Sequence, residues 1–244
     1  KEYGGPHPNG KPTTFKYPKL QWAVNFTNAT GSSLEVSTSG GSKRFTREFT
    51  ILPKKIDYNA ILGNTAPLAI VTSSIYENSG YFTGSFGASA EFPVYSGNPI
   101  TFFIKNDTTG NKLNITASSY IDNKINRITF NIDSATDDKF YIGPDTGSNN
   151  PIYQTSSFQI HNFKGYKTAD LTFLESETHT KDPDVLTSYA TNLNYYAALG
   201  ANAITESLSS DYHFKDTSNN EHTSGFLNLR NYDSTQIKYS SIEY

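Results

Sequence analysis

The 244-residue sequence contains no cysteine and no methionine, and it has a single tryptophan. Without cysteine there is no disulfide scaffold, no thiol chemistry, no iron–sulfur cluster and no cysteine-ligated zinc. A chain of this length can bury enough apolar surface to fold without disulfides, so their absence is compatible with secretion. Because the chain begins at Lys1 rather than at methionine, we expect a processed protein located outside the cell or on its surface.

The sequence is also poor in charge and has no long apolar run. Charged residues make up 18% of the chain, and the net charge is −3. No apolar stretch approaches the roughly 20 residues that a transmembrane helix needs. A weakly acidic chain gives no electrostatic basis for binding nucleic acid. The sequence therefore predicts neither a transmembrane segment nor a nucleic-acid partner.

Aromatic residues are abundant, with 17 tyrosines and 16 phenylalanines. They occur in short segments that alternate apolar and polar residues, and turns rich in Ser, Gly and Asn separate these segments. Segments about ten residues apart with this pattern predict a mainly β protein, an antiparallel β-sandwich or jelly roll. One face of the first strand would bury Trp22, Val24 and Phe26. Later predicted strands include Ile100–Lys105, Lys112–Tyr120, Lys124–Ile132 and Thr168–Leu174, with a hairpin turn at Asn106–Gly110.

One helix is predicted near residues 183–200. Asp182 could cap it and Pro183 fits its first position, while Tyr189, Leu193 and Tyr196 follow at helical spacing. Residues 20–244 would form the β-sandwich region. A polar, Gly- and Pro-containing stretch at 133–151 is the best candidate for a division of that region.

The first 19 residues differ from the rest, with four prolines and three glycines. This composition predicts an extended arm rather than a helix. Phe15 and Tyr17 would lie on one face of the single stretch able to form a strand. We therefore expect the arm to add to the sheet edge of another subunit and to stabilise a homo-oligomer.

No catalytic motif is present. The nucleophile elbow, the phosphate-binding loop and the dinucleotide fingerprint are all missing, and Gly84-Ser-Phe-Gly87 has the wrong spacing for the first of these. Carboxylate pairs for glycoside hydrolysis cannot be told from chance among 23 acidic residues. We predict a protein that is not an enzyme and has no organic cofactor.

Two weaker kinds of site remain. Oxygen-rich loops suit calcium, and Asp133, Asp137, Asp138 and Asp145 are candidate ligands of a structural calcium ion. Asn-x-Thr sequons, which are candidate glycosylation sites, occur at Asn25, Asn28, Asn106 and Asn114.

Three functions are compatible with this class of protein. The first prediction is a structural surface protein, either a filament or pilus-type subunit or an adhesin, that assembles through strand addition. The second is a secreted β-rich toxin whose segment 65–92 could rebuild into a pore. The third is a carbohydrate-binding module with a glycan or host-surface ligand, whose aromatic side chains would stack on sugar rings. Candidate aromatics for that role are Tyr76, Tyr81, Tyr95 and Tyr120.

Overall fold

The computed structural model describes the strands and one continuous region around the helix. The described residues are 22–29, 33–37, 44–53, 59–63, 67–73, 79–84, 91–95, 99–106, 112–121, 123–133, 139–142, 156–183, 185–197, 204–206, 212–214, 227–230 and 237–241. The predicted arm, with Phe15 and Tyr17, lies outside them, so its part in assembly stays a prediction.

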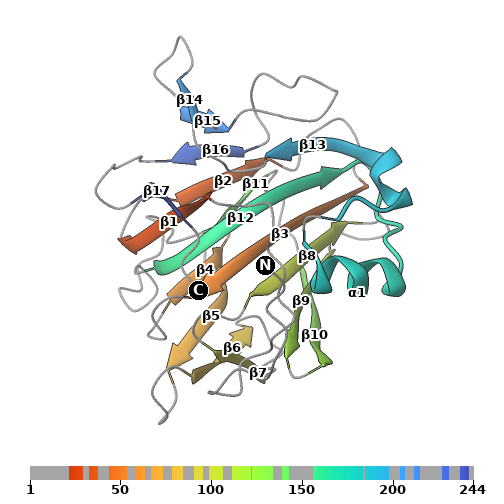
Figure 1. Cartoon of the computed structure of the whole chain (residues 1–244), viewed down its shortest axis with the longest axis horizontal. Coiled ribbons are helices and arrows are strands. Elements are labelled where there is room, and N and C mark those ends of the chain that lie inside the picture. Colours follow the sequence, from red (N-terminus) through yellow and green to blue (C-terminus); the bar gives the residue numbers. More distant parts are fainter. Residues whose placement is uncertain are drawn as a thin grey trace, which may run out of the picture.

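The described chain forms two antiparallel sheets that pack as a β-sandwich (Figure 1). The first sheet has the order β10-β9-β8-β3-β12-β1-β17, with β13 paired to β12. The second has the order β14-β15-β16-β2-β11-β4-β5-β6-β7. The sheets meet where β7 lies against β10 and β4 against β12. This architecture confirms the predicted fold class.

The strands have the following bounds. In the first sheet they are β1 Trp22–Ala29, β3 Phe45–Pro53, β8 Ile100–Asn106, β9 Lys112–Ile121, β10 Lys124–Asp133, β12 Ser156–Tyr166, β13 Leu193–Ala197 and β17 Ile237–Ser241. In the second they are β2 Ser33–Ser37, β4 Asn59–Gly63, β5 Pro67–Ser73, β6 Ser79–Gly84, β7 Glu91–Tyr95, β11 Lys139–Ile142, β14 Ile204–Glu206, β15 Tyr212–Phe214, β16 Leu227–Arg230.

The stretch at 133–151 contains strand β11, which pairs with both β2 and β4. Each sheet contains strands from before and after this stretch. Residues on either side of it are therefore hydrogen-bonded into the same two sheets.

The first sheet has one apolar face, and its opposite face, here called the polar face, carries buried polar side chains beside a cluster that includes Phe103 and Tyr166. On the apolar face Phe49 stacks on Phe102 with ring centroids 5.2 Å apart, and on Phe163 at 6.3 Å. The neighbouring residues along β3, Thr46, Glu48 and Thr50, point the opposite way because strand side chains alternate. These polar side chains are nevertheless buried, so the polar face is covered here.

The cover includes the helix α1, Phe173–Lys181, which lies over β8 and β9 (Figure 1). Thr172 caps it, since its hydroxyl accepts from the Glu175 amide while the Glu175 carboxylate accepts from the Thr172 amide. This reciprocal capping box satisfies amides that the first helical turn leaves unbonded. No helix in the described part of the chain is long and apolar enough to cross a membrane.

The predicted position of the helix is wrong. Residues 183–200 contain the 3-10 turn η2, Ser188–Asn192, followed by strand β13. The aromatic residues there pair with β12, with Tyr195 opposite Gly165, so tertiary pairing overrides a helical spacing. Pro183 follows the end of α1 instead of starting a helix. The predicted strand Thr168–Leu174 is wrong as well, because α1 begins inside it.

Candidate functional site

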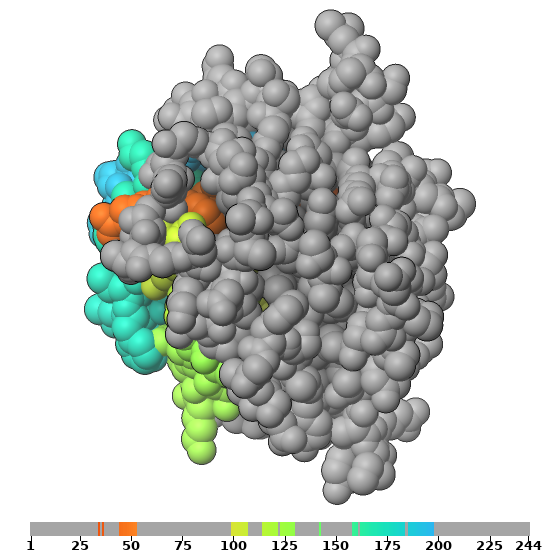
Figure 2. All heavy atoms as spheres, turned by 180° about the vertical axis from the view of Figure 1, so that it is seen from behind, coloured from red at the N-terminus to blue at the C-terminus, as the bar shows by residue number. Residues whose placement is uncertain are grey.

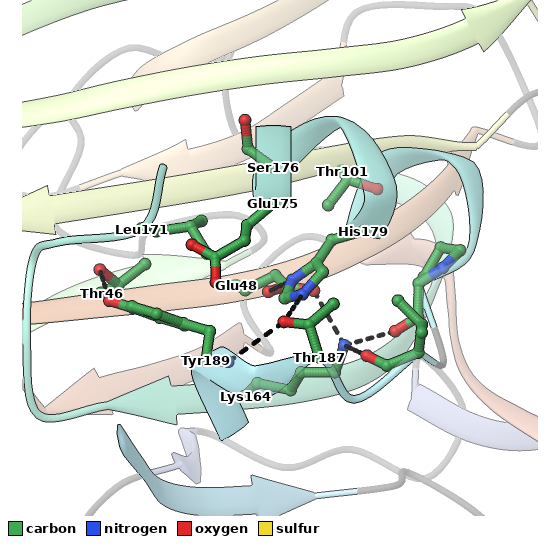
Figure 3. A network of polar contacts seen from close by, with 12 residues as sticks. Thr46, Glu48, Thr101, Lys164, Leu171, Glu175, Ser176, His179, Thr187 and Tyr189 are labelled. Atoms are coloured by element: carbon green, nitrogen blue, oxygen red, sulfur yellow. Dashed lines mark hydrogen bonds and ion pairs between the residues drawn. The ribbon is translucent and has the colours of Figure 1, made fainter. Parts of the chain in front are cut away.

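Three ionisable side chains meet on the covered polar face of the first sheet. The Lys164 ammonium lies 3.0 Å from Glu48 Oε1, and His179 Nδ1 lies 2.7 Å from Glu48 Oε2. Their side chains are 0%, 1% and 1% exposed for Lys164, Glu48 and His179. Figure 3 shows them converging from β12, β3 and α1. We call these three residues the buried clasp.

A β-bulge places Lys164 in the clasp. Strand β12 pairs with β3 through Ile160 opposite Ile51, and again through Phe163 opposite Phe49, so one extra residue of β12 lies between the two pairs. That residue, Asn162, has a φ of 36°, in the left-handed region that asparagine tolerates better than most residues. Without the extra residue, Phe163 would point to the polar face and Lys164 to the apolar one.

The clasp fixes the chain that follows α1. Lys164 Nζ donates to the carbonyls of Pro183 at 2.5 Å and Val185 at 3.3 Å, in addition to Glu48. Asn162 Nδ2 also donates to the Pro183 carbonyl, at 2.7 Å. An ammonium group has three donors and no acceptor. Lys164 therefore has an acceptor for each of its donors.

Opposing effects act on the Glu48 carboxyl. Burial alone would raise its pKa, but the charge of Lys164 and the hydrogen bond from His179 outweigh burial, and the pKa lies below its usual value. Glu48 is thus a carboxylate in the folded protein. It also accepts from the Tyr166 hydroxyl at 3.3 Å, and burial together with this carboxylate raises the pKa of Tyr166.

A hydroxyl completes a chain of contacts through the imidazole. Thr187 Oγ1 lies 3.1 Å from His179 Nε2, on the far side of the ring from Glu48. The order hydroxyl, imidazole, carboxylate is that of hydrolase triads. Here Thr187 also caps η2, where its hydroxyl oxygen accepts from the Tyr189 amide at 3.3 Å. The Thr187 hydroxyl thus contacts both the imidazole and the Tyr189 amide, and each of these groups has a partner.

Burial decides what the clasp can do. Hydrolase triads act on a substrate that reaches the hydroxyl and the imidazole, and here the side chains of Glu48 and His179 are each 1% exposed. Tyr189 adds to the attachment, since its hydroxyl contacts the Thr168 hydroxyl at 2.8 Å and the Thr168 carbonyl at 3.1 Å. The clasp and Tyr189 thus hold α1 and η2 against the sheet, and the buried Glu48 and His179 are closed to a ligand.

Next to the clasp, α1 and the β9–β10 hairpin form an exposed surface. Phe173 is 66% exposed and Leu174 is 70% exposed. The Arg127 guanidinium carbon lies 4.0 Å from the centre of the Phe173 ring, and its Nη2 donates to Ser176 Oγ at 2.8 Å. In the space-filling view the hairpin, in green, lies beside the teal atoms of this region (Figure 2). Arg127 therefore fixes one side of an aromatic ring that remains open to solvent.

The same surface continues along the hairpin and the helix. At the far end of α1, the Lys181 ammonium lies 5.7 Å from the Tyr120 ring, and the Tyr120 hydroxyl donates to Asn123 Oδ1 at 3.1 Å. On β9 and β10 the hydroxyls of Thr116 and Thr129 lie 2.9 Å apart. We call the set of Phe173, Arg127, Thr129, Tyr120 and Lys181 the hairpin surface.

Of the residues proposed from sequence, Tyr120 belongs to the hairpin surface. Tyr81 and Tyr95 lie in strands β6 and β7, Asp133 ends β10, and no cluster of three or more metal-ligand side chains occurs within the described ranges. Asp137, Asp138, Asp145 and Tyr76 lie outside those ranges, so the calcium site stays a prediction. The sequons Asn25 and Asn28 lie in β1, Asn106 ends β8 and Asn114 lies in β9.

Sequence reasoning missed both the clasp and Phe173. Glu48 and Lys164 are far apart in the chain, and only the strand register brings them together. The signal for Phe173 was present, because Thr172 and Glu175 have the spacing of a capping box directly around it.

Comparisons with known proteins identify a fold and no family. No protein-family model matches the chain, and no curated protein matches it significantly. A solved structure of a candidate carbohydrate-binding protein from Bacteroides ovatus matches 93% of the chain with a TM-score of 0.57 at 18% identity. The chain spans 61% of that protein's length. The likeness shows a shared β-sandwich fold.

Two other matches are more distant. A heptameric pentraxin from Limulus polyphemus covers 66% of this chain and 82% of its own, at 9% identity and a TM-score of 0.38. Peanut lectin covers 62% of this chain and 91% of its own, at 13% identity and a TM-score of 0.30. These scores are too low to support an argument about this chain.

Proposed function

We propose that this protein is an extracellular carbohydrate-binding protein that holds its ligand on the hairpin surface. The observation that carries the proposal is the Phe173 ring, 66% exposed and held by Arg127 at 4.0 Å. Exposed phenylalanine normally costs free energy, because its apolar surface stays in water. A ring fixed in that position offers a flat platform, and the aliphatic C–H face of a sugar packs on the electron-rich face of an aromatic ring.

The polar groups around the ring suit sugar hydroxyls. Binding sites of small ligands combine apolar contact area with a few placed hydrogen-bonding groups. The Arg127 guanidinium beside the platform is a donor, and so is the exposed Thr129, two residues further along the same face of β10; Tyr120 supplies a second ring along the helix. The fold shared with the Bacteroides ovatus protein, a candidate carbohydrate-binding protein, supports the same class of ligand.

The clasp supports this surface from below. Helix α1 has nine residues, and a helix this short is marginal on its own in water. The contact of His179 with Glu48 ties its last turn to the sheet. We infer that the clasp keeps Phe173 and Lys181 in fixed places before a ligand arrives, which lowers the entropy cost of binding.

The test is a glycan array followed by titration of each bound glycan. We expect at least one polysaccharide class to bind, and Phe173→Ala to weaken that binding by roughly tenfold or more, the loss of about 1.5 kcal/mol of aromatic contact. Leu186→Ala is the matched control, because Leu186 is an exposed apolar residue, 51% exposed, outside the hairpin surface. Equal loss in both variants, or no bound glycan, would refute the proposal.

A further inference from the structure

We infer that the glycan bound by the hairpin surface is acidic, carrying carboxylate or sulfate groups, and that Arg127 is the residue that recognises the anionic group. This inference rests on the proposed function and names the ligand class of the same site. It comes from the charges around Phe173, which the described carboxylates do not neutralise by direct contact.

Arg127 is held in place but retains hydrogen-bonding capacity. Its Nη2 donates to Ser176, and its guanidinium contacts the Phe173 ring. Among the residues that the structure describes, no carboxylate forms a salt bridge with it, and its buried Nε has no hydrogen-bond partner. A guanidinium presents five donors in a fixed planar arrangement that matches carboxylate and sulfate oxygens. Arg127 is therefore preorganised for an anion beside the aromatic platform.

A second cation lies close to Arg127. Lys105 Nζ donates to the Leu171 carbonyl at 2.7 Å, two residues before Phe173. Burial lowers the pKa of Lys105, and repulsion from Arg127 lowers it further. The charges of Asp170 and Glu175 act on this pKa in the opposite direction without forming a salt bridge to Lys105. Two like charges placed together without a bound carboxylate destabilise the protein, and an anionic ligand would offset that cost.

The nearby carboxylates are mostly engaged elsewhere. Asp170 is bonded to Arg44 at 2.6 Å, and Glu175 accepts from the amide and hydroxyl of Thr172. Glu177 acts on Arg127 only from beyond salt-bridge distance, and its negative charge raises the pKa of Arg127 against the lowering effect of burial. Among the described residues no carboxylate contacts Arg127 directly, so a carboxylate or sulfate on a ligand would supply that contact.

The spacing of the charges indicates an oligosaccharide. Lys181 lies eight residues after Phe173 on α1, which places the two ends about 12 Å apart along the helix axis. Each end combines a cation with an aromatic ring, Arg127 with Phe173 and Lys181 with Tyr120. A chain of several acidic sugars, rather than one sugar, would contact both ends.

The experiment measures binding of the full chain to three polymers of different charge. Polygalacturonate carries carboxylates, dextran sulfate carries sulfates, and dextran is neutral. We expect one or both acidic polymers to bind at least tenfold more tightly than dextran, with affinity falling as salt rises. Arg127→Gln should weaken acidic binding by roughly tenfold or more, and Arg127→Lys, which keeps the charge but not the planar donors, should weaken it less.

Lys124→Gln is the matched control for charge, since Lys124 is an exposed cation on the same strand. It should change affinity less than twofold, and melting curves confirm that each variant is folded. Equal binding of dextran and the acidic polymers, or an Arg127→Gln variant that binds as the parent does, would overturn the acidic ligand while leaving carbohydrate binding intact. No binding to any glycan, in this set or on the array, would overturn the proposed function itself.

Discussion

Glu48 and Lys164 are direct cross-strand partners on β3 and β12, and their charged groups meet 3.0 Å apart at 1% and 0% exposure. Removing two charges from water costs several kcal/mol each, and their attraction repays this only when the remaining donors and acceptors are bonded. These donors and acceptors are bonded here. The Pro183 and Val185 carbonyls accept from Lys164, and the His179 ring and the Tyr166 hydroxyl contact the Glu48 carboxylate. The pair therefore fastens the segment that carries α1.

Replacing one partner of this pair should lower the free energy of unfolding more than replacing both partners together. Glu48→Gln leaves a buried ammonium without a counter-ion, and Lys164→Met leaves a buried carboxylate, so each should lower the free energy of unfolding by about 3–5 kcal/mol. The double variant Glu48→Gln/Lys164→Met should lose much less than the sum. Urea denaturation of all four proteins measures the coupling.

Arg44→Gln is the control for that cycle. It removes a salt bridge to Asp170 whose side chains are 49% and 62% exposed, and an exposed pair contributes at most about 1 kcal/mol. Additive losses from the two clasp substitutions would contradict the account of the clasp.

The clasp also predicts a dependence of stability on acid. The pKa of Glu48 is lower in the folded protein than its usual value, so the unfolded chain binds its proton at higher pH than the folded one. The stabilisation is therefore complete above the unfolded pKa of about 4.3 and is lost as the pH falls through the folded value. Between about pH 5 and about pH 3 the free energy of unfolding should fall less steeply in Glu48→Gln/Lys164→Met than in the parent. Identical slopes would mean that Glu48 contributes nothing to the acid response.

The bulge at Asn162 gives a test of strand geometry. Its φ of 36° suits glycine, whereas a β-branched residue is strained there. Asn162→Val should therefore destabilise the protein by more than Asn162→Gly, although both remove the hydrogen bond to the Pro183 carbonyl. The difference should be at least about 1 kcal/mol in thermal or chemical denaturation. Equal stabilities would show that the bulge relaxes without cost.

The alternation of apolar residues was enough to predict several strands almost to the residue. The strands predicted at 100–105, 112–120 and 124–132 correspond to β8, β9 and β10, and each pairs with its sequence neighbour. A hairpin is predictable from local sequence, and here the turn-forming residues of Asn106–Gly110 lie between two apolar segments.

The helix and the clasp depended on contacts that the sequence does not display. The spacing of Tyr189, Leu193 and Tyr196 is helical, yet pairing of β13 with β12 decides their conformation. The bulge at Asn162 cannot be read from local pattern, so the meeting of Lys164 with Glu48 could not be predicted. The capping box at Thr172 and Glu175 was a readable signal for α1, and the competing strand pattern of residues 168–174 masked it.

The most direct test of the central claim is to locate the bound glycan by NMR on the isotopically labelled full chain. Titration with the tightest glycan from the array should shift amide resonances of residues 116–129 and 171–181 most, because these carry the hairpin surface. At the same subsaturating glycan concentration, Phe173→Ala should greatly reduce those shifts, whereas Leu186→Ala should retain them. Shifts concentrated in β4–β7, or shifts that Phe173→Ala leaves unchanged, would place the ligand elsewhere and contradict the account.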